Sequence, residues 1–203
     1  MKIDSNFEFQ IIILIIGDSG VGKTNFIYQF AEGKFNEMHV STVGLDFKSK
    51  IIKLPKLNKI VKLQIWDTAG QERYMAINKN LFQKVEGIII MYDISNRNSF
   101  ENINKWLNLA TQVTSNKTMM LVGNKLDLAK VSRVVSEREG EELAKSHRIL
   151  FGEGSGCSGE NVDKVFISIA EKIFQRLMDD KSEDLNTNVN INKEPIKEKQ
   201  KCC

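Results

Sequence analysis

Short apolar runs alternate with amphipathic stretches along most of the chain. Apolar runs of about four to eight residues are typical of buried strands, whereas apolar residues spaced three and four apart are typical of helices. The first run, residues 9–16, ends in six consecutive Ile and Leu residues, and a helical stretch follows at 25–32. This alternation, with short connections, predicts an α/β fold.

The other elements follow from the same two patterns, and some have recognisable ends. Gly33 stands where a helix C-terminus favours a left-handed residue, and Ser136 with Glu139 has the spacing of a capping box. The predicted strands are 9–16, 43–54, 60–66, 88–92, 119–122 and 149–151, of which the second and third form a hairpin with its turn near Pro55, Asn58 and Lys59; the predicted helices are 25–32, 99–113, 136–147 and one that begins at 162.

The end of the chain divides into two contrasting segments. From Val162 to Leu177 apolar residues recur at helical spacing, which we assign to core packing. From Asp179 onward most residues are Asp, Glu, Lys or Asn, and such a segment lacks the apolar surface that offsets the entropy of ordering. We therefore predict an N-terminal extension at 1–8, one domain at 9–178 and a disordered tail at 179–203.

Composition narrows the class of protein. A chain of 203 residues with 41% hydrophobic and 27% charged residues suits one sizeable core. The net charge of +3, with no basic cluster among aromatics, argues against nucleic-acid binding. No apolar run approaches the roughly 20 residues of a membrane span, and no leader is evident. Three cysteines form no disulfide framework or spaced metal-ligand set, which indicates a cytosolic, reducing compartment.

Residues 17–24 read G-D-S-G-V-G-K-T and match the phosphate-binding pattern G-x-x-x-x-G-K-[ST]. Glycines let backbone N–H groups converge on phosphate oxygens, and the following helix N-terminus adds its dipole. Lys23 is placed to reach the β- and γ-phosphates, and the Thr24 hydroxyl to hold Mg²⁺. A simple Gly-rich turn is the alternative, but the strand before it and the helix after it favour the phosphate loop. We assign nucleotide contacts to Asp18, Ser19, Gly20, Val21, Gly22, Lys23, Thr24 and Asn25.

A second string, W-D-T-A-G-Q-E-R-Y at 66–74, follows a predicted strand. Asp67 is predicted to bind Mg²⁺, through a water, and Gly70 to offer an N–H to the γ-phosphate. Gln71 is predicted to orient the attacking water. Thr42, in the polar loop 34–43, would alone be read as a solvated threonine, as Asp67 would be read as a solvated strand end. Beside a phosphate loop we predict that Thr42 is a metal ligand and γ-phosphate sensor.

The motif N-K-L-D at 124–127, which directly follows a predicted strand, indicates which base is bound. Guanine presents N1–H and an N2 amine side by side, and the two carboxylate oxygens of Asp127 can accept both. Adenine has an acceptor at N1 and no amine at C2, so it would leave the carboxylate unpaired. A site built on such a pair rejects the analogue that lacks it by up to about 10⁴ to 10⁵. A lone N-K-x-D is a common surface turn; behind a phosphate loop and Asp67 it indicates guanine.

Together these strings resemble the Rab branch of the Ras-like small GTPases, over about residues 9 to 178. T-V-G-L-D-F at 42–47 is similar to the Rab stretch after switch I, and the string around Asp67 is similar to switch II. The resemblance implies a P-loop NTPase fold with a mixed, mostly parallel six-stranded sheet flanked by helices. It also implies that Asn124 contacts the base and tethers the phosphate loop, that the Lys125 stem covers the ring, and that Phe35 packs on its edge.

Three segments depart from the family. Ser155, Gly156 and Cys157 stand where Rab-like proteins have Ser-Ala-Lys; Gly156 can still offer an N–H to the guanine oxygen, but the bracing lysine is absent. Cys157 is either a reactive thiol or, as we favour, a small filler residue, since no base is adjacent in sequence. Residues 75–84 differ from the usual switch II, and the hairpin turn is about two residues longer than in most of the family, so partner choice is not carried over.

The function implied is a GTP/GDP switch that hydrolyses GTP slowly and recruits effectors in vesicle traffic. Rab-like proteins commonly carry prenyl groups on a terminal pair such as Cys202 and Cys203, although an unmodified pair is the alternative. The implied partners are an exchange factor, a GTPase-activating protein, effectors, a prenylation escort protein and a GDP-dissociation inhibitor. The implied location is the cytoplasmic face of an endomembrane, vesicle or plasma membrane, with a cytosolic pool. A P-loop ATPase or kinase, and a nucleotide-bound scaffold that hardly hydrolyses GTP, remain as alternatives.

Overall fold

The computed structural model describes residues 7–36, 45–68, 83–113 and 117–191. The chain divides into two compact units, residues 1–173 and residues 174–203, and each is described by itself. The first unit holds the whole sheet, and the second continues the last helix.

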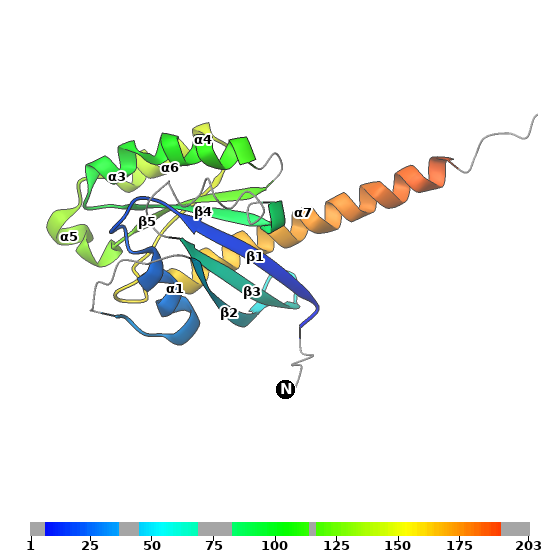
Figure 1. The fold of residues 1–203 in the computed structure, drawn as a ribbon, viewed down its shortest axis with the longest axis horizontal. Coiled ribbons are helices and arrows are strands. Elements are labelled where there is room, and N and C mark those ends of the chain that lie inside the picture. The colour runs from blue at the N-terminus through cyan, green and yellow to red at the C-terminus, as the bar shows by residue number, and fades with distance from the viewer. Residues whose placement is uncertain (1–6, 37–44, 69–82, 114–116, 192–203) are drawn as a thin grey trace, which may run out of the picture. The chain divides into compact units, whose positions relative to one another are not determined.

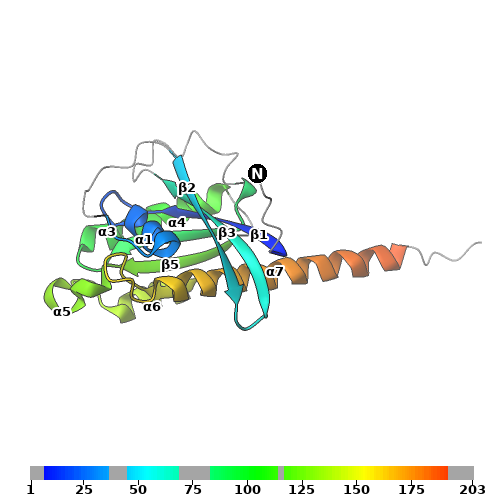
Figure 2. The ribbon, with the colours of Figure 1, turned by 90° about the horizontal axis from the view of Figure 1, so that it is seen from below.

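Six strands form one sheet in the order β2-β3-β1-β4-β5-β6 (Figure 1). Among the described strands, β2 and β3 are antiparallel and the other four neighbouring pairs are parallel. Figure 2 shows β2 and β3 running side by side as a hairpin to their common turn. This arrangement confirms the predicted α/β fold with a mixed, mostly parallel sheet. The strands are β1 Phe9–Ile16, β2 Leu45–Leu54, β3 Lys59–Thr68, β4 Gly87–Asp93, β5 Thr118–Asn124 and β6 Leu150–Glu153.

Helices cover both faces of the sheet. They are α1 Lys23–Glu32, α3 Arg97–Glu101, α4 Ile103–Val113, α5 Ala129–Ser132, α6 Glu137–Ser146 and α7 Val162–Ile191, with a 3₁₀ turn, η2, at Leu126–Leu128. Figure 1 shows α3, α4 and α6 on one side of the sheet and α1 on the other. On the first side, Trp106 packs in a buried cluster with Leu14. On the second side, Phe166 packs against Phe26 and Phe30, at centroid distances of 5.8 and 4.1 Å.

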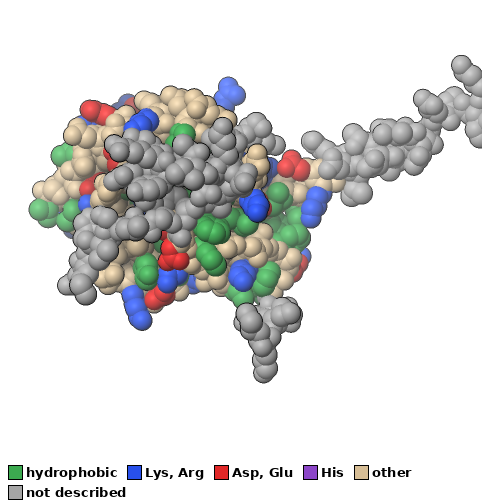
Figure 3. Space-filling model, in the orientation of Figure 1, with side chains coloured by type: hydrophobic (Ala, Val, Ile, Leu, Met, Phe, Trp, Pro, Cys, Tyr) green, Lys and Arg blue, Asp and Glu red, His purple; other side chains and the backbone are tan. Residues whose placement is uncertain are grey.

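The sheet is buried because its central strands are almost wholly apolar. All seven residues of β4 are buried, as are the last four of β1. Strands buried on both faces read as continuous apolar runs, which is why these two were predictable. The parallel strands β1, β3, β4, β5 and β6 end at a common edge, where the described loops after β1, β4 and β5 begin. Figure 3 shows acidic and basic side chains interspersed over one described face, in keeping with the small net charge.

Most predicted boundaries agree with the structure. Strand β1 matches its prediction at both ends, and Gly33 ends α1 in the left-handed conformation with φ 64°. The capping box is confirmed: Glu139 N donates to Ser136 Oγ (3.3 Å), and Ser136 N donates to Glu139 Oε2 (2.9 Å). Most of the apolar residues predicted to pack in the core from the last helix are buried, and Leu177 is half-buried. Within residues 1–173 the buried ones are Val162, Val165, Phe166, Ile169 and Ile173.

The single helix predicted over 99–113 is wrong in two respects. It begins earlier, because the Asn96 side chain caps it by accepting from Asn98 N (3.1 Å) and Ser99 N (3.4 Å). It also divides at Asn102 into α3 and α4, although no Gly or Pro marks the break. Sequence reasoning also missed η2 and α5, which are too short to show a periodic pattern.

The last helix also differs from its prediction. α7 continues to Ile191, so residues 179–191 are helical where composition predicted disorder. This stretch contains neither Gly nor Pro, and adding turns to an existing helix needs no new nucleus. Residues 192–203 lie outside the described residues, and the domain boundaries at 8 and 178 stay predictions. No helix in the described part of the chain is both long enough and apolar enough to cross a membrane.

Candidate nucleotide-binding site

The loop between β1 and α1 wraps around a buried ammonium group. Lys23, 5% exposed, donates from Nζ to the backbone oxygens of Gly17 (2.8 Å) and Asp18 (2.8 Å). Burial lowers the pKa of Lys23 to about 8, although the carboxylates of Asp67 and Asp18 act in the opposite direction. A phosphate at this loop would add negative charge and favour the protonated amine. The loop therefore has the geometry and charge of an anion site.

Two oxygen groups meet beside this lysine. Thr24 Oγ1 donates to Asp67 Oδ2 (2.7 Å), and Asp67 is 5% exposed near the end of β3. A hydroxyl and a carboxylate are the ligands that a hard cation such as Mg²⁺ takes, so this pair fits the predicted metal site. No group of three or more His, Cys, Asp or Glu side chains forms a metal cage in the described part of the chain. A cation here would need further oxygen ligands, such as phosphate and water.

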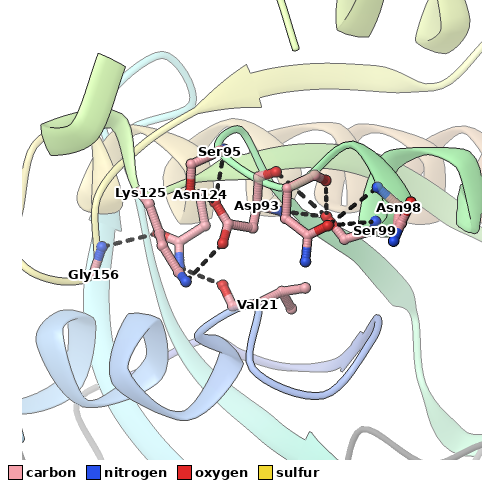
Figure 4. Close-up of polar contacts among 9 residues, drawn as sticks. Val21, Asp93, Ser95, Asn98, Ser99, Asn124, Lys125 and Gly156 are labelled. Carbon is pink, nitrogen blue, oxygen red and sulfur yellow. Dashed lines mark hydrogen bonds and ion pairs between the residues drawn. The ribbon is translucent and has the colours of Figure 1, made fainter. Parts of the chain in front are cut away.

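Asn124 joins the phosphate loop to the loop after β6. Its Nδ2 donates to Val21 O (2.8 Å), and its Oδ1 accepts from Gly156 N (3.0 Å) (Figure 4). The side chain is 2% exposed, so neither bond competes with bulk water. A Cβ at Gly22 would lie 2.5 Å from Asn124 Nδ2, and Gly22 has φ 92°, so a glycine is required for this approach. The predicted tether is therefore present as a contact between three segments distant in sequence.

Lys125 is held in place by a residue that sequence reasoning missed. It adopts a left-handed backbone with φ 68°, and its Nζ lies 2.6 Å from Asp93 Oδ2. Asp93 is 5% exposed, and its Oδ1 accepts from Ser95 N (2.8 Å) and Ser95 Oγ (2.6 Å). Figure 4 shows these side chains converging between β4 and β5. The position of Asp93 at the carboxyl end of a central strand was the available signal.

Asp127 is oriented by Ser155. The Ser155 hydroxyl donates to Asp127 Oδ1, and its oxygen accepts from Cys157 N (3.1 Å) and Ser158 N (3.0 Å). Ser155 is fully buried, so the carboxylate is fixed from one side while Asp127 itself is exposed. Asp127 is thus an exposed residue beside the loop 155–157 with one carboxylate oxygen held by Ser155.

The loop after β6 is braced although the family lysine is absent. Arg133 donates from Nη1 to Glu153 Oε1 (2.8 Å) and from Nη2 to Glu153 Oε2 (2.7 Å). Glu153 is 8% exposed, and its side-chain bond raises the pKa of Arg133. Gly154 N also donates to Gly123 O (2.9 Å), which ties the loop to the end of β5. Cys157 is exposed, so the predicted role as a packed filler residue is wrong.

Restoring the family residue at 156 is expected to destabilise this protein. In Gly156→Ala the new Cβ would lie 2.9 Å from Phe26 N, 3.0 Å from Phe26 Cα and 3.1 Å from Asn25 C, all of them backbone atoms of α1. The loop must then move away from α1. We expect the free energy of unfolding to fall by about 1 to 3 kcal/mol in denaturant melts. Cys157→Ala, at the exposed neighbour, should change it by less than about 0.5 kcal/mol. Equal stability of the two variants would contradict the close approach.

The remaining predicted residues fall into two groups. Phe35, 43% exposed, lies in a segment held by Asn25, whose Nδ2 donates to Asn36 O (3.1 Å) and whose Oδ1 accepts from Asn36 N (3.3 Å). Ser19 and Gly20 are exposed in the phosphate loop. Five predicted site residues lie outside the described residues: Thr42, Gly70, Gln71, Cys202 and Cys203.

Comparison with known proteins agrees with this geometry. The model of the Ras family matches residues 12–175, and the chain belongs to the Ras family. Within it the chain is a Rab-like small GTPase. It is 43% identical over 171 residues to Ras-related protein Rab-10 of Diplobatis ommata, covering 84% of each chain. It is 42% identical over 185 residues to Ras-related protein Rab-10 of Caenorhabditis elegans, covering 91% of this chain and 90% of that one. It is also similar to Ras-related protein RAB1BV of Beta vulgaris, at 41% identity over 86% of this chain and 81% of that one.

Proposed function

We propose that this chain binds GTP and GDP with Mg²⁺ and acts as a molecular switch. The observation that carries the proposal is the side chain of Asn124, which bridges Val21 O of the phosphate loop and Gly156 N of the loop after β6. This contact joins the loop proposed to bind phosphate to the loop whose Ser155 holds Asp127, the residue proposed to bind guanine, and so supports a single nucleotide site. Membership of the Ras family supports the same conclusion.

Different residues are proposed to bind the phosphates, the metal and the base. Lys23 and the backbone N–H groups of the loop would bind the phosphates, and Asp127 the guanine edge. Thr24, Asp67 and Thr42 are the proposed metal ligands. Mg²⁺, when bound, neutralises charge that develops on the phosphate oxygens. Thr42 and Gly70 are proposed to sense the γ-phosphate, and its loss would release the two loops that effectors read.

Competition between nucleotides tests this proposal directly. The full chain, stripped of nucleotide and loaded with a fluorescent GDP, should release it to excess GTP or GDP and retain it in excess ATP. A P-loop ATPase or kinase would show the reverse order. Inosine diphosphate, which lacks the N2 amine, should compete more weakly than GDP because it leaves one acceptor of Asp127 unpaired.

We also propose that the chain hydrolyses GTP slowly. Gln71 is proposed to orient the attacking water, so the intrinsic rate should be roughly 10⁻⁴ to 10⁻² s⁻¹ and rise with a partner that supplies an arginine. Gln71→Leu fills similar space without hydrogen bonds; we expect it to bind GTP as tightly and to hydrolyse it at least about tenfold more slowly in a single turnover. An unchanged rate removes Gln71 from the reaction. A wild-type rate no faster than that of free GTP would favour the nucleotide-bound scaffold instead.

We further propose a Rab-type role in vesicle traffic, with the terminal pair Cys202 and Cys203 prenylated. Each buried CH₂ contributes about 0.8 kcal/mol, and stable anchoring generally takes two such signals. A Cys202→Ser, Cys203→Ser variant should bind GTP normally and move to the cytosolic fraction. Membrane retention of that variant, or two free thiols in the native C-terminal peptide by mass spectrometry, would overturn the anchor. The proposed partners are an exchange factor, a GTPase-activating protein, effectors, a prenylation escort protein and a GDP-dissociation inhibitor.

A further inference from the structure

The carboxylate of Asp18, the second residue of the phosphate loop, is held by two donors, one at the break between α3 and α4 and one within α4. Trp106 Nε1 donates to Asp18 Oδ1 (2.7 Å), and Asn102 Nδ2 donates to Asp18 Oδ2 (2.7 Å). Each oxygen of the carboxylate therefore has one strong, charge-assisted hydrogen bond. The contacts join residues separated by 88 and 84 positions in the chain.

These donors are placed by the break between α3 and α4. Asn102 is the residue at which the two helices separate, and it has φ −74° and ψ −7°. Trp106 is 1% exposed and belongs to the core cluster that covers this face of the sheet. Its indole is therefore a rigid donor, because a packed aromatic ring has few rotamers to lose. Asn102, which is exposed, is the second donor. We call these two donors, Asn102 and Trp106, the Asp18 clamp.

The clamp acts on the atoms that form the phosphate cradle. The backbone oxygen of Asp18 also accepts from Lys23 Nζ (2.8 Å), so the side chain and the main chain of one residue are fixed at the same time. A loop rich in glycine has many alternative backbone conformations, and a nucleotide must pay for restricting them when it binds. Holding Asp18 removes part of that conformational freedom before the nucleotide arrives.

We propose that Asn102 and Trp106 are positioning residues for the phosphate loop, acting through Asp18 to slow nucleotide dissociation. The inference rests on the proposed function, since it assigns a role within the same nucleotide site. It adds to that site a junction of two helices whose own residues are not predicted nucleotide contacts and which reach the site through Asp18. The Asp18 carboxylate thereby serves as an anchor of the loop.

The test exchanges donor and acceptor across the clamp. Asn102→Asp places a second carboxylate against Asp18 and should speed release of a fluorescent GDP from the full chain about tenfold, the effect of losing one charge-assisted hydrogen bond. In the Asp18→Asn background the same substitution restores a donor and acceptor pair, because the new amide can donate to the new carboxylate while its oxygen still accepts from Trp106. There, Asn102→Asp should leave the release rate unchanged or slow it.

Controls separate this coupling from simpler causes. Asn108→Asp adds the same charge to an exposed position of α4 and should leave the release rate unchanged. An added charge that merely repels phosphate would speed release in both backgrounds, and that result overturns the inference. An unchanged rate for Asn102→Asp in the wild-type background overturns it as well. Failure of the wild-type chain to retain GDP would instead refute the proposed function, so the two failures are distinguishable.

Discussion

Asp127→Asn is expected to move the nucleotide preference of this chain from GTP to XTP. The substitution exchanges one acceptor oxygen for a donor amide, which suits the C2 carbonyl of xanthine and faces the N2 amine of guanine with another donor. A site built for a hydrogen-bonding pair rejects the unpaired analogue by up to about 10⁴ to 10⁵. We expect the ratio of GTP to XTP affinity, measured by competition, to fall by about 10⁴.

Ser155 makes this switch more predictable, because it determines which way the new amide points. Its hydroxyl oxygen accepts from Cys157 N and Ser158 N, which uses both lone pairs, so its proton must go to residue 127. An asparagine there must turn its oxygen toward Ser155 and its amide nitrogen toward the base. Asp163→Asn, at a side chain that is 70% exposed, is the matched control and should keep the preference for GTP. If Asp127→Asn also keeps it, the role assigned to Asp127 is wrong.

The fold was largely predictable because the sequences of its central strands are compatible with few structures other than buried strands. The last four residues of β1 and all seven of β4 are buried, and a continuous apolar run is typical of a strand that is buried on both faces. The phosphate loop was predictable for another reason: its glycines and its lysine must occupy fixed positions for the backbone to close around Nζ. Their spacing is therefore visible in one sequence, as is that of Asn124 and Asp127.

The parts that could not be predicted depend on partners distant in sequence. Asp93 carries no motif of its own, and its place beside Lys125 follows from the pairing of β4 with β5. Asn102 offers no breaking signal, yet the helix divides there, where its side chain meets Asp18. The close approach of Gly156 to α1 likewise depends on tertiary structure. A glycine in a loop sequence ordinarily indicates only that the backbone can adopt many conformations. Local patterns find elements and motifs, whereas these contacts arise only when the sheet brings the loops together.

Gly17→Ala is expected to abolish the native fold or to leave it marginal. Gly17 has φ 146°, a backbone conformation that L side chains rarely adopt. Its Cβ would also overlap the backbone oxygen of Met91 and lie 3.1 Å from Met91 C and 3.4 Å from Met91 N. These atoms belong to the buried centre of β4, which has no room to move. We expect the free energy of unfolding to fall by at least about 3 kcal/mol, a large part of the 5 to 15 kcal/mol typical of a domain.

Gly33→Ala provides a control for a glycine with positive φ that meets no neighbouring atom. Gly33 also has positive φ, 64°, but no atom lies within 4 Å of its would-be Cβ. Its replacement should cost about 1 to 2 kcal/mol, the penalty of a left-handed residue alone. Urea melts of both variants, read by circular dichroism, measure the difference. Gly17, at φ 146°, is further from conformations open to alanine than Gly33, so the larger loss in Gly17→Ala reports that strain together with the collision against Met91 in β4. Equal decreases in the free energy of unfolding would mean that the loop can move away from Met91, and that β4 does not fix the position of the phosphate loop.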